Sequence, residues 1–394
     1  MSRNSLKWLP AIVVPAVVIT GIVALPLQAG AAVDLPDKSA KDVLLMVADS
    51  DVTAFSGEVE KTANLGLPSM DVSAGLSPGM VDQMSEQVPE GMEDFVPGAA
   101  ATGAMAAALE LFSGSHTARV YVDGPDKVRV QVQDSLAERN IVSNGTDAWL
   151  YDSESNTATH AEIPAELTAD IEEKIAAAQV LAPADLSTPS QIADRFLSEI
   201  DPSTTVSVGT DGVVAGRSAY ELILTPKTTE TLVESVSIAV DSETGLPLGV
   251  TVRAVGQEDP AFRAAFTEID LSAPASTLFD FTPPAGATVD ELAVPEMTDG
   301  QKPELTPEQQ AEVDALRAAP PVVTGEAWST VVELPADTIP AELRENELLA
   351  ELTTEVDGGR VLSTSLVNVL LATDGRVFAG SVPVAQLQAA ASAQ

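Results

Sequence analysis

The feature that most constrains this chain is a strict alternation of apolar and polar residues that begins at Ser115. Successive side chains of a β-strand point to opposite faces, so a period of two predicts strands with one apolar and one polar face. A turn at Gly124-Pro125-Asp126 separates the first two such segments. The sequence therefore predicts an antiparallel hairpin that carries its valines on one side.

The same pattern recurs, with interruptions, between Thr53 and Leu271. Roughly ten short strands with one amphipathic pattern predict a single curved antiparallel sheet, an incomplete barrel whose apolar side is covered or cupped. A β-sandwich is the less favoured alternative because strong helical segments interrupt the strands. The strands are predicted at 53–60, 117–122, 127–133, 140–143, 148–152, 157–161, 204–208, 213–216, 218–225, 235–241, 246–255 and 261–271.

Three helical segments accompany these strands and make the predicted fold class α+β. Ser39 and Asp42 predict the start of a helix before the first strand. Apolar residues at four-residue spacing predict a second helix at 167–175, and a capping sequence at Thr188 predicts a third that ends near Ile200. We expect these helices to lie over the apolar face of the sheet.

The remaining segments divide the chain into domains. Residues 65–108 lack a persistent period and predict an insertion within a domain at 39–289. An acidic, proline-containing linker is predicted at 290–322, with one short helix near 308–318. Residues 323–394 predict a small α+β domain that should lean on the larger domain or on a partner. Its elements are a strand at 326–334, a helix at 341–352, a hairpin of 359–371 with 376–382 around Asp374-Gly375, and a helix at 384–391.

The first 31 residues predict export from the cytoplasm. Arg3 and Lys7 precede an apolar segment of about nineteen residues at 9–27. Pro26 and the small residues of Ala29-Gly30-Ala31 fit cleavage by a signal peptidase after residue 31. A segment of this length also fits an uncleaved membrane anchor. Both alternatives place the rest of the chain outside the cytoplasm, because the basic residues hold the N-terminus inside.

Charge and composition exclude several classes of function. The chain carries 59 Asp and Glu against 20 Lys and Arg, a net charge of -39, which repels nucleic-acid phosphates and anionic lipid head groups. Cysteine is absent, so disulfides, thiol catalysis and an acylated N-terminal cysteine are excluded. No phosphate-binding loop, nucleophile elbow or His-Glu-x-x-His sequence occurs. The sequence predicts a non-enzyme with no cofactor and no metal.

Four segments, read in order, resemble the LolA-like family of periplasmic lipoprotein carriers. They are 120–130 (VYVDGPDKVRV), 141–152 (IVSNGTDAWLYD), 241–248 (DSETGLPL) and 279–286 (FDFTPPAG). The resemblance spans about 39–289 and implies a hydrophobic cavity that receives acyl chains. With its smaller C-terminal domain, the chain also resembles the RseB-like (MucB-like) envelope-stress regulators.

One position departs from the family pattern. LolA-like proteins commonly carry an arginine before the proline of the second-strand turn, and this chain has Gly124 there. Lid control by that arginine, and the carrier cycle that depends on it, are therefore not expected. The resemblance implies that the partner is a lipid or lipid-modified protein. A sensor that regulates a membrane protein through its C-terminal domain is the alternative.

The apolar sheet face is the candidate ligand site. From the residues alone, the same face also fits ordinary core packing, and the family resemblance favours a cavity for alkyl chains. The candidate residues are the valines, leucines and isoleucine that share this face: Val120, Val122, Val128, Val130, Val132, Leu222, Leu224, Val236, Ile238, Val240, Val250 and Val252.

Other conspicuous residues are weaker candidates. Trp149 and Tyr151 share a strand face and predict packing more than a recognition platform. His116 and His160, the two histidines, lack the neighbours of a catalytic or metal site. Trp328 and the hairpin at Asp374-Gly375 are the candidates for contact with a protein partner.

Overall fold

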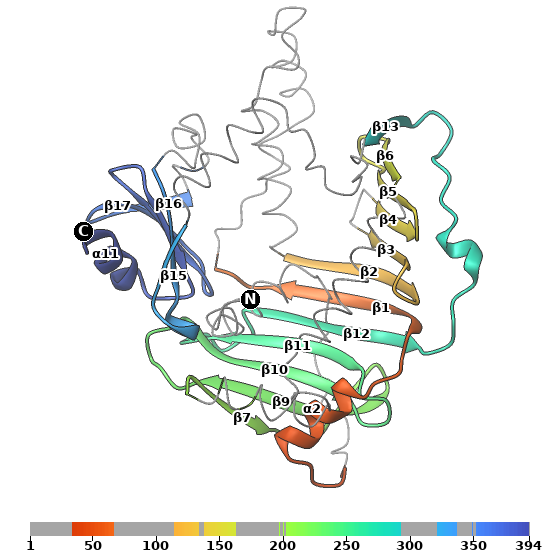
Figure 1. The fold of residues 1–394 in the computed structure, drawn as a ribbon, viewed down its shortest axis with the longest axis horizontal. Coiled ribbons are helices and arrows are strands. Elements are labelled where there is room, and N and C mark those ends of the chain that lie inside the picture. The colour runs from red at the N-terminus through yellow and green to blue at the C-terminus, as the bar shows by residue number, and fades with distance from the viewer. Residues whose placement is uncertain are drawn as a thin grey trace, which may run out of the picture.

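The computed structural model describes residues 34–66, 114–133, 138–162, 202–292, 321–336 and 352–393, with the single residues 197, 200 and 349. These residues form two sheets, a large one of 13 strands and a smaller one of 6 strands near the C-terminus (Figure 1). The described part of the chain is therefore mostly β, with fewer helices than an α+β fold implies.

The large sheet has the strand order β13-β6-β5-β4-β3-β2-β1-β12-β11-β10-β9-β7, and β8 pairs with β9 off this path. Its strands are β1 (Ala54–Ala63), β2 (Gly114–Asp123), β3 (Lys127–Gln133), β4 (Glu138–Asn144), β5 (Asp147–Asp152), β6 (Thr157–Glu162), β7 (Thr204–Val208), β8 (Gly212–Val214), β9 (Arg217–Pro226), β10 (Val233–Asp241), β11 (Pro247–Ala254), β12 (Phe262–Asp270) and β13 (Thr288–Leu292). The sheet is open, because its edge strands β13 and β7 do not pair with each other. It curves so that β3 to β6 rise as a wall at one side (Figure 1).

The prediction of an antiparallel sheet holds for every pair except one. The edge strand β13 runs parallel to β6, with Val289 opposite Ala158. Its sequence lies partly in the predicted linker, and its residues are all exposed. A short segment whose residues are all exposed has no apolar alternation to indicate a strand, so the sequence did not predict β13.

The twelve predicted ligand residues all lie on one face of this sheet, which we call the inner face. Directly opposed residues in a ladder share a face. Val120 pairs with Val130, and Val236 pairs with both Leu224 and Val252. The antiparallel register therefore confirms the apolar face that the alternation predicts.

Helix α2 (Ala40–Ala48) covers the inner face of β7, β9 and β10. A capping box starts it, in which the Asp42 amide donates to Ser39 Oγ (3.2 Å) and the Ser39 amide donates to Asp42 Oδ2 (3.0 Å). Val43 is fully buried against Tyr220, Leu222 and Val240. The helix predicted from Ser39 and Asp42 is thus confirmed, and it covers part of the apolar face.

The outer face of β3 to β6 is covered by the segment that follows β12. This segment contains the 3₁₀ turn η3 (Ser276–Phe279), and Phe279 is buried. Arg129 fastens the turn by donating from Nη1 to the Leu278 carbonyl oxygen (2.9 Å).

The C-terminal sheet is antiparallel, with the order β14-β15-β19-β18-β17-β16. Helix α11 packs on it, and Leu387 of this helix is buried among Val331, Leu370 and Phe378. The elements are β14 (Val322–Thr324), η4 (Ala327–Ser329), β15 (Val331–Leu334), β16 (Thr353–Val356), β17 (Gly359–Ser363), β18 (Asn368–Ala372), β19 (Val377–Gly380) and α11 (Val384–Ser392). This sheet and helix form what we call the C-terminal unit.

The C-terminal unit is joined to the large sheet by a shared core. Trp328 and Leu366 are buried against Val236, Val252 and Phe262 of the inner face. Backbone bonds add to the junction, since the Leu232 amide donates to the Ser381 carbonyl oxygen (2.8 Å). The expectation that the tail leans on the larger domain agrees with this contact.

Two predicted strands of the tail were too long. The predicted strand at 359–371 is interrupted by a turn in which Thr364 Oγ1 accepts from the amide of Val367 (2.8 Å). The predicted strand at 326–334 begins instead with the turn η4, where Ala327 has a φ of 49°. In both cases a local polar turn outweighs the apolar pattern.

Several predictions lie outside the described residues. These include the signal or anchor segment, the insertion at 65–108 beyond Gly66, the helix at 167–175 and the short helix near 308–318. The helices predicted at 188–200 and 341–352 are described only at Leu197, Ile200, Leu349 and Leu352, which are helical. Among the described residues, no helix is long and apolar enough to cross a membrane.

Candidate ligand-binding face

The inner face of β2 to β5 carries a continuous apolar row. Val120 pairs with Val130, Val130 with Ile141, and Ile141 with Leu150, so the four side chains stand side by side across four strands. At about 4.8 Å between neighbouring strands, the row is about 14 Å long. We call these four residues the apolar row.

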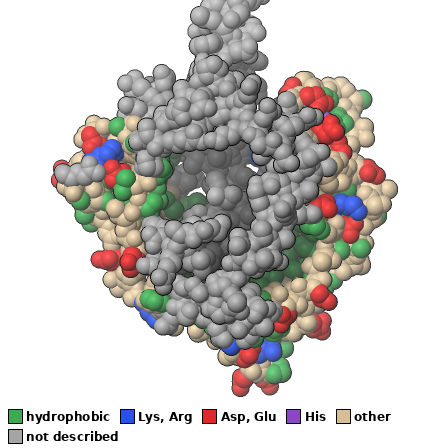
Figure 2. All heavy atoms as spheres, viewed as in Figure 1, with side chains coloured by type: hydrophobic (Ala, Val, Ile, Leu, Met, Phe, Trp, Pro, Cys, Tyr) green, Lys and Arg blue, Asp and Glu red, His purple; other side chains and the backbone are tan. Residues whose placement is uncertain are grey.

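The apolar row is accessible. Ile141 is 49% exposed and Leu150 is 48% exposed, and both valines of the row are half-buried. A second row beside it contains Val122 and Val128, also half-buried. Hydrophobic side chains, drawn in green, are visible toward the centre of the view in Figure 2. Exposed branched side chains that adjoin one another form a surface suited to an apolar ligand.

Charged residues mark one border of this surface. In the row on the other side of the apolar row, Val132 pairs with Arg139, and Arg139 pairs with Asp152. Arg139 Nε lies 3.3 Å from Asp152 Oδ2. An ion pair at the edge of an apolar surface leaves a polar border where a ligand's head group meets water.

The rest of the inner face is packed. Leu222 and Val240 are buried under α2, with exposures of 2% and 0%. Val236 and Val252 are buried under Trp328 of the C-terminal unit. Leu224, Ile238 and Val250 are partly buried in the same two clusters. Seven of the twelve predicted ligand residues therefore lie under α2 or the C-terminal unit. Of the other five, Val120 is half-buried and packs against the core cluster of Val59 and Phe266, so the accessible apolar surface narrows to the valines of β2 and β3.

Ile141 and Leu150 were missed from the sequence. The predicted strand at 140–143 holds only four residues, and the neighbours of Ile141 give no clear alternation. Its orientation follows only from its pairing with Val130. The signal that pointed to them was the hairpin turn Asn144-Gly145, which sets the register between their strands.

The opposite face of β5 carries an aromatic cluster. Trp149 and Tyr151 lie 5.5 Å and 5.9 Å from Phe281, measured between ring centroids. Val142, which pairs with Trp149, is 1% exposed. The interpretation of Trp149 and Tyr151 as packing residues agrees with this arrangement.

His160 connects the edge strands of the wall. Its ring stacks on Trp149 at 4.1 Å, Nδ1 lies 2.9 Å from Glu291 Oε2, and Nε2 lies 3.1 Å from Asp147 Oδ1. Burial by itself lowers the pKa of His160, but the two carboxylates outweigh it and raise the pKa above the ordinary value. The histidine therefore fastens β13 to β5 and β6.

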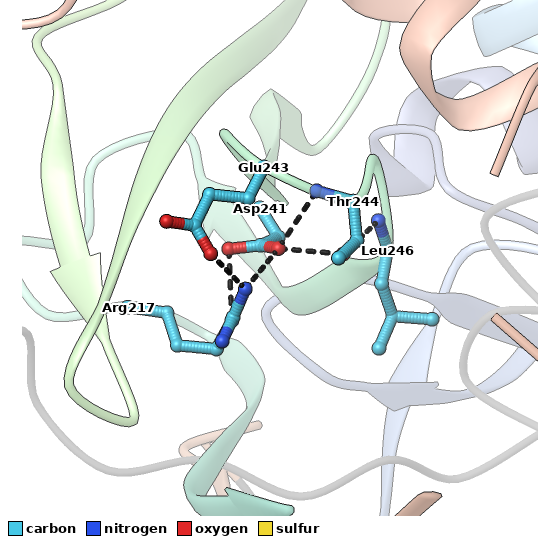
Figure 3. A network of polar contacts seen from close by, with 5 residues as sticks. All are labelled: Arg217, Asp241, Glu243, Thr244 and Leu246. Carbon is cyan, nitrogen blue, oxygen red and sulfur yellow. Dashed lines mark hydrogen bonds and ion pairs between the residues drawn. The ribbon is translucent and has the colours of Figure 1, made fainter. Parts of the chain in front are cut away.

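The segment 241–248 that resembles the LolA-like family builds a turn and not a binding site. Arg217 donates two hydrogen bonds to the buried Asp241 carboxylate, at 3.0 Å and 2.8 Å, and a third to Glu243 at 2.9 Å (Figure 3). Thr244 donates its amide to the same carboxylate (3.0 Å). Burial would raise the pKa of Asp241, but the bonds from Arg217 and Thr244 hold it below the ordinary value.

This turn positions α2. Gly245 has a φ of 74°, and a Cβ there would lie 1.9 Å from the Met46 carbonyl oxygen. Only glycine meets both conditions. The motif is therefore a structural device that seats the covering helix on the sheet.

Gly124 stands at the position where LolA-like proteins commonly carry an arginine. It has a φ of 76°, and its amide donates to the Thr53 carbonyl oxygen (2.8 Å). A side chain is disfavoured in this left-handed conformation.

The other candidates from the sequence fall outside this surface. Trp328 is 5% exposed and is buried at the junction of the two sheets, so it is not free for a protein partner. His116 is half-buried on β2, opposite Lys61. In the described ranges, no three His, Asp or Glu side chains converge as metal ligands.

Part of the chain matches the model of a described protein family. Residues 103–291 match a family described as "Predicted periplasmic protein (DUF2092)". The extracytoplasmic location predicted from the N-terminal segment is confirmed at the level of this family. No curated protein matches the chain.

Solved structures are similar at low identity. The complex of MucA and MucB from Pseudomonas aeruginosa shares 14% identity, covers 89% of this chain and 96% of that chain, and has a TM-score of 0.39. An uncharacterized conserved protein from Thermus thermophilus shares 10% identity over 64% of this chain and 99% of that one, with a TM-score of 0.32. A LolA superfamily protein from Nitrosomonas europaea shares 9%, covers 62% and 99%, and has a TM-score of 0.22. At these scores the likeness carries no conclusion about ligands or partners.

Proposed function

We propose that this chain, whose residues 103–291 match a family of predicted periplasmic proteins, is a non-catalytic binding protein for acyl chains. The ligand is a lipid or a lipid-modified polypeptide, and it lies against the apolar row on the inner face. One observation carries the proposal: on β4 and β5 the outer face is packed, with Val142 buried and Trp149 and Tyr151 against Phe281, whereas the inner face exposes nearly half of Ile141 and Leu150.

The chemistry of the row fits an alkyl chain. Valine, isoleucine and leucine offer apolar area and no directed polar contact, which is what a chain of methylenes requires. Each methylene removed from water contributes about 0.8 kcal/mol, so a chain that follows a row of about 14 Å gains several kcal/mol. The ion pair of Arg139 and Asp152 lies at the border, where a head group would meet solvent.

A direct test uses the neutral fluorophore N-phenyl-1-naphthylamine, which the net charge of -39 does not repel. We expect its fluorescence to rise with the purified exported protein and to fall when a monoacyl glycerol is added. Ile141→Asp and Leu150→Asp should each weaken binding at least tenfold, because a carboxylate loses most of its hydration under an apolar chain.

The matched control is Val255→Asp. Val255 is 63% exposed beyond β11 and far along the chain from the apolar row. This variant should bind the fluorophore as the parent protein does. If all three variants weaken binding equally, or none does, the ligand lies elsewhere and the proposal is wrong.

A second candidate function is a sensor that passes ligand occupancy to a membrane protein. It is favoured by one observation, namely that the C-terminal unit rests on the same apolar face through Trp328. In a Trp149→Phe variant, Trp328 is the one tryptophan left after residue 31. A shift of its emission on adding the lipid indicates a sensor, and unchanged emission with full binding indicates a carrier.

A further inference from the structure

A shallow trough lies on the outer face of the large sheet, on the side away from the apolar row. Its floor is a row of small residues, in which Ala239 pairs with Gly249 and Gly249 pairs with Ala265. A Cβ on Gly249 would lie 2.2 Å from the Ala265 Cβ, so no other residue fits. The hairpin of β8 and β9 bounds the trough through Val214.

A polar row lies beside this floor. Ser237 on β10 pairs with Thr251 on β11, and Thr251 pairs with Arg263 on β12. All three side chains line the trough, and all three are half-buried. Among the residues that the structure describes, neither hydroxyl has a hydrogen-bond partner.

Arg263 differs from most of the described arginines, which donate hydrogen bonds or form ion pairs. Arg129, Arg217 and Arg376, for example, each donate at least two hydrogen bonds. Within the described ranges, Arg263 makes neither a hydrogen bond nor an ion pair. A half-buried guanidinium normally has a partner, and this chain has 59 acidic residues to supply one.

The electrostatic environment of Arg263 also lacks an anion that fully compensates its charge. Burial lowers the pKa of its guanidinium, and the attraction of Glu60 only partly opposes this. The Glu60 carboxylate itself accepts from Ser115 Oγ at 3.1 Å. An anion placed in the trough would supply the missing partner.

We propose that the trough is a carboxylate-binding site in which Arg263 holds the ligand and the hydroxyls of Ser237 and Thr251 donate to it. The guanidinium fork matches the two oxygens of a carboxylate. A singly charged group is favoured over a phosphate dianion, because Glu221 lines the same trough and the net charge of the protein is -39. This site is independent of acyl-chain binding on the inner face.

The test follows the arginine Nε–H signals of the exported protein by NMR while sodium acetate is added, with sodium chloride at equal ionic strength as the reference. The signal that disappears in Arg263→Gln identifies this residue. We expect that signal to shift and saturate with acetate and to stay in place with chloride. The matched control is Arg253→Gln, which changes an exposed arginine of β11 that donates to the Glu258 carbonyl oxygen; its acetate response should equal that of the parent.

Peptides distinguish a free acid from a polypeptide terminus. If an acetylated tripeptide binds tighter than acetate, and amidation of its C-terminus removes the tighter binding, the site takes a polypeptide end. If the tripeptide and acetate bind equally, the site takes small acids. A second readout is the melting temperature, which should stay or rise in Arg263→Gln without acetate, because a half-buried charge without a partner is removed. A fall in melting temperature of Arg263→Gln with no saturable acetate shift in the parent, or a chloride shift equal to that of acetate, overturns the proposal.

Discussion

One side chain, that of Trp328, provides most of the contact at the junction between the two sheets. Trp328 is 5% exposed, packs against Val236 and Val252, and donates from Nε1 to Thr204 Oγ1 at 2.8 Å. Truncation of a buried tryptophan to alanine costs about 3–5 kcal/mol. Trp328→Phe keeps most of the apolar contact and loses the hydrogen bond, which costs about 1–2 kcal/mol.

Urea unfolding followed by circular dichroism measures these free energies of unfolding. We expect Trp328→Ala to separate the transition into two, with the C-terminal unit released and cleaved first in limited proteolysis. Val323→Ala is the control, since Val323 lies on β14 of the same unit and is 40% exposed. If Trp328→Ala and Val323→Ala change the free energy equally, within about 0.5 kcal/mol, Trp328 does not hold the two sheets together.

Three further predictions concern the elements around the apolar face. Because the pKa of His160 is raised, its contribution to stability is complete below its ordinary value of 6.5 and is lost as the pH rises through the folded-state pKa. The melting temperature should therefore fall between pH 5 and 8, and His160→Gln should remove this fall. An unchanged fall in the variant would show that His160 is not its source. Asp241→Asn leaves Arg217 without its buried carboxylate and should cost about 3 kcal/mol in urea unfolding, whereas Glu243→Gln, on the exposed partner, should cost under about 1 kcal/mol. Gly245→Ala should displace α2 and cost on the order of 2 kcal/mol or more, with faster hydrogen exchange at 43–48 as the sign of that displacement and unaltered exchange as the result against it.

The alternation of apolar and polar residues was sufficient to predict most strands. Val120, Val128 and Leu222 were assigned correctly to one face, because a period of two depends only on local sequence. The capping residues Ser39 and Asp42 were sufficient for α2 in the same way. Local chemistry of this kind can be read without knowledge of the fold.

The sequence did not show which apolar residues are covered. Leu222 and Val130 both have apolar residues two positions away on either side, yet Leu222 is buried under α2 and Val130 is half-buried. The difference arises from contacts between segments far apart in the chain, such as that of Val43 with Leu222. Tertiary contacts of this range leave no periodic signal.

The same reason explains the errors at Trp328 and β13. An exposed and a buried tryptophan look alike in sequence, and the contact of Trp328 with Thr204 joins residues 124 positions apart. The parallel pairing of β13 with β6 is carried by backbone bonds and by His160 with Glu291. Neither histidine nor glutamate in isolation predicts a pairing.

Photo-crosslinking of the exported protein with a lipopeptide that carries a diazirine at the end of its acyl chain shows where the chain lies on the sheet. Mass spectrometry of the digested adduct locates the attachment. The account predicts attachment within 118–152, on the strands that carry Ile141 and Leu150, and loss of the adduct in Leu150→Asp. Attachment confined to β7, β9 and β10, or an adduct that persists in Leu150→Asp, would contradict it.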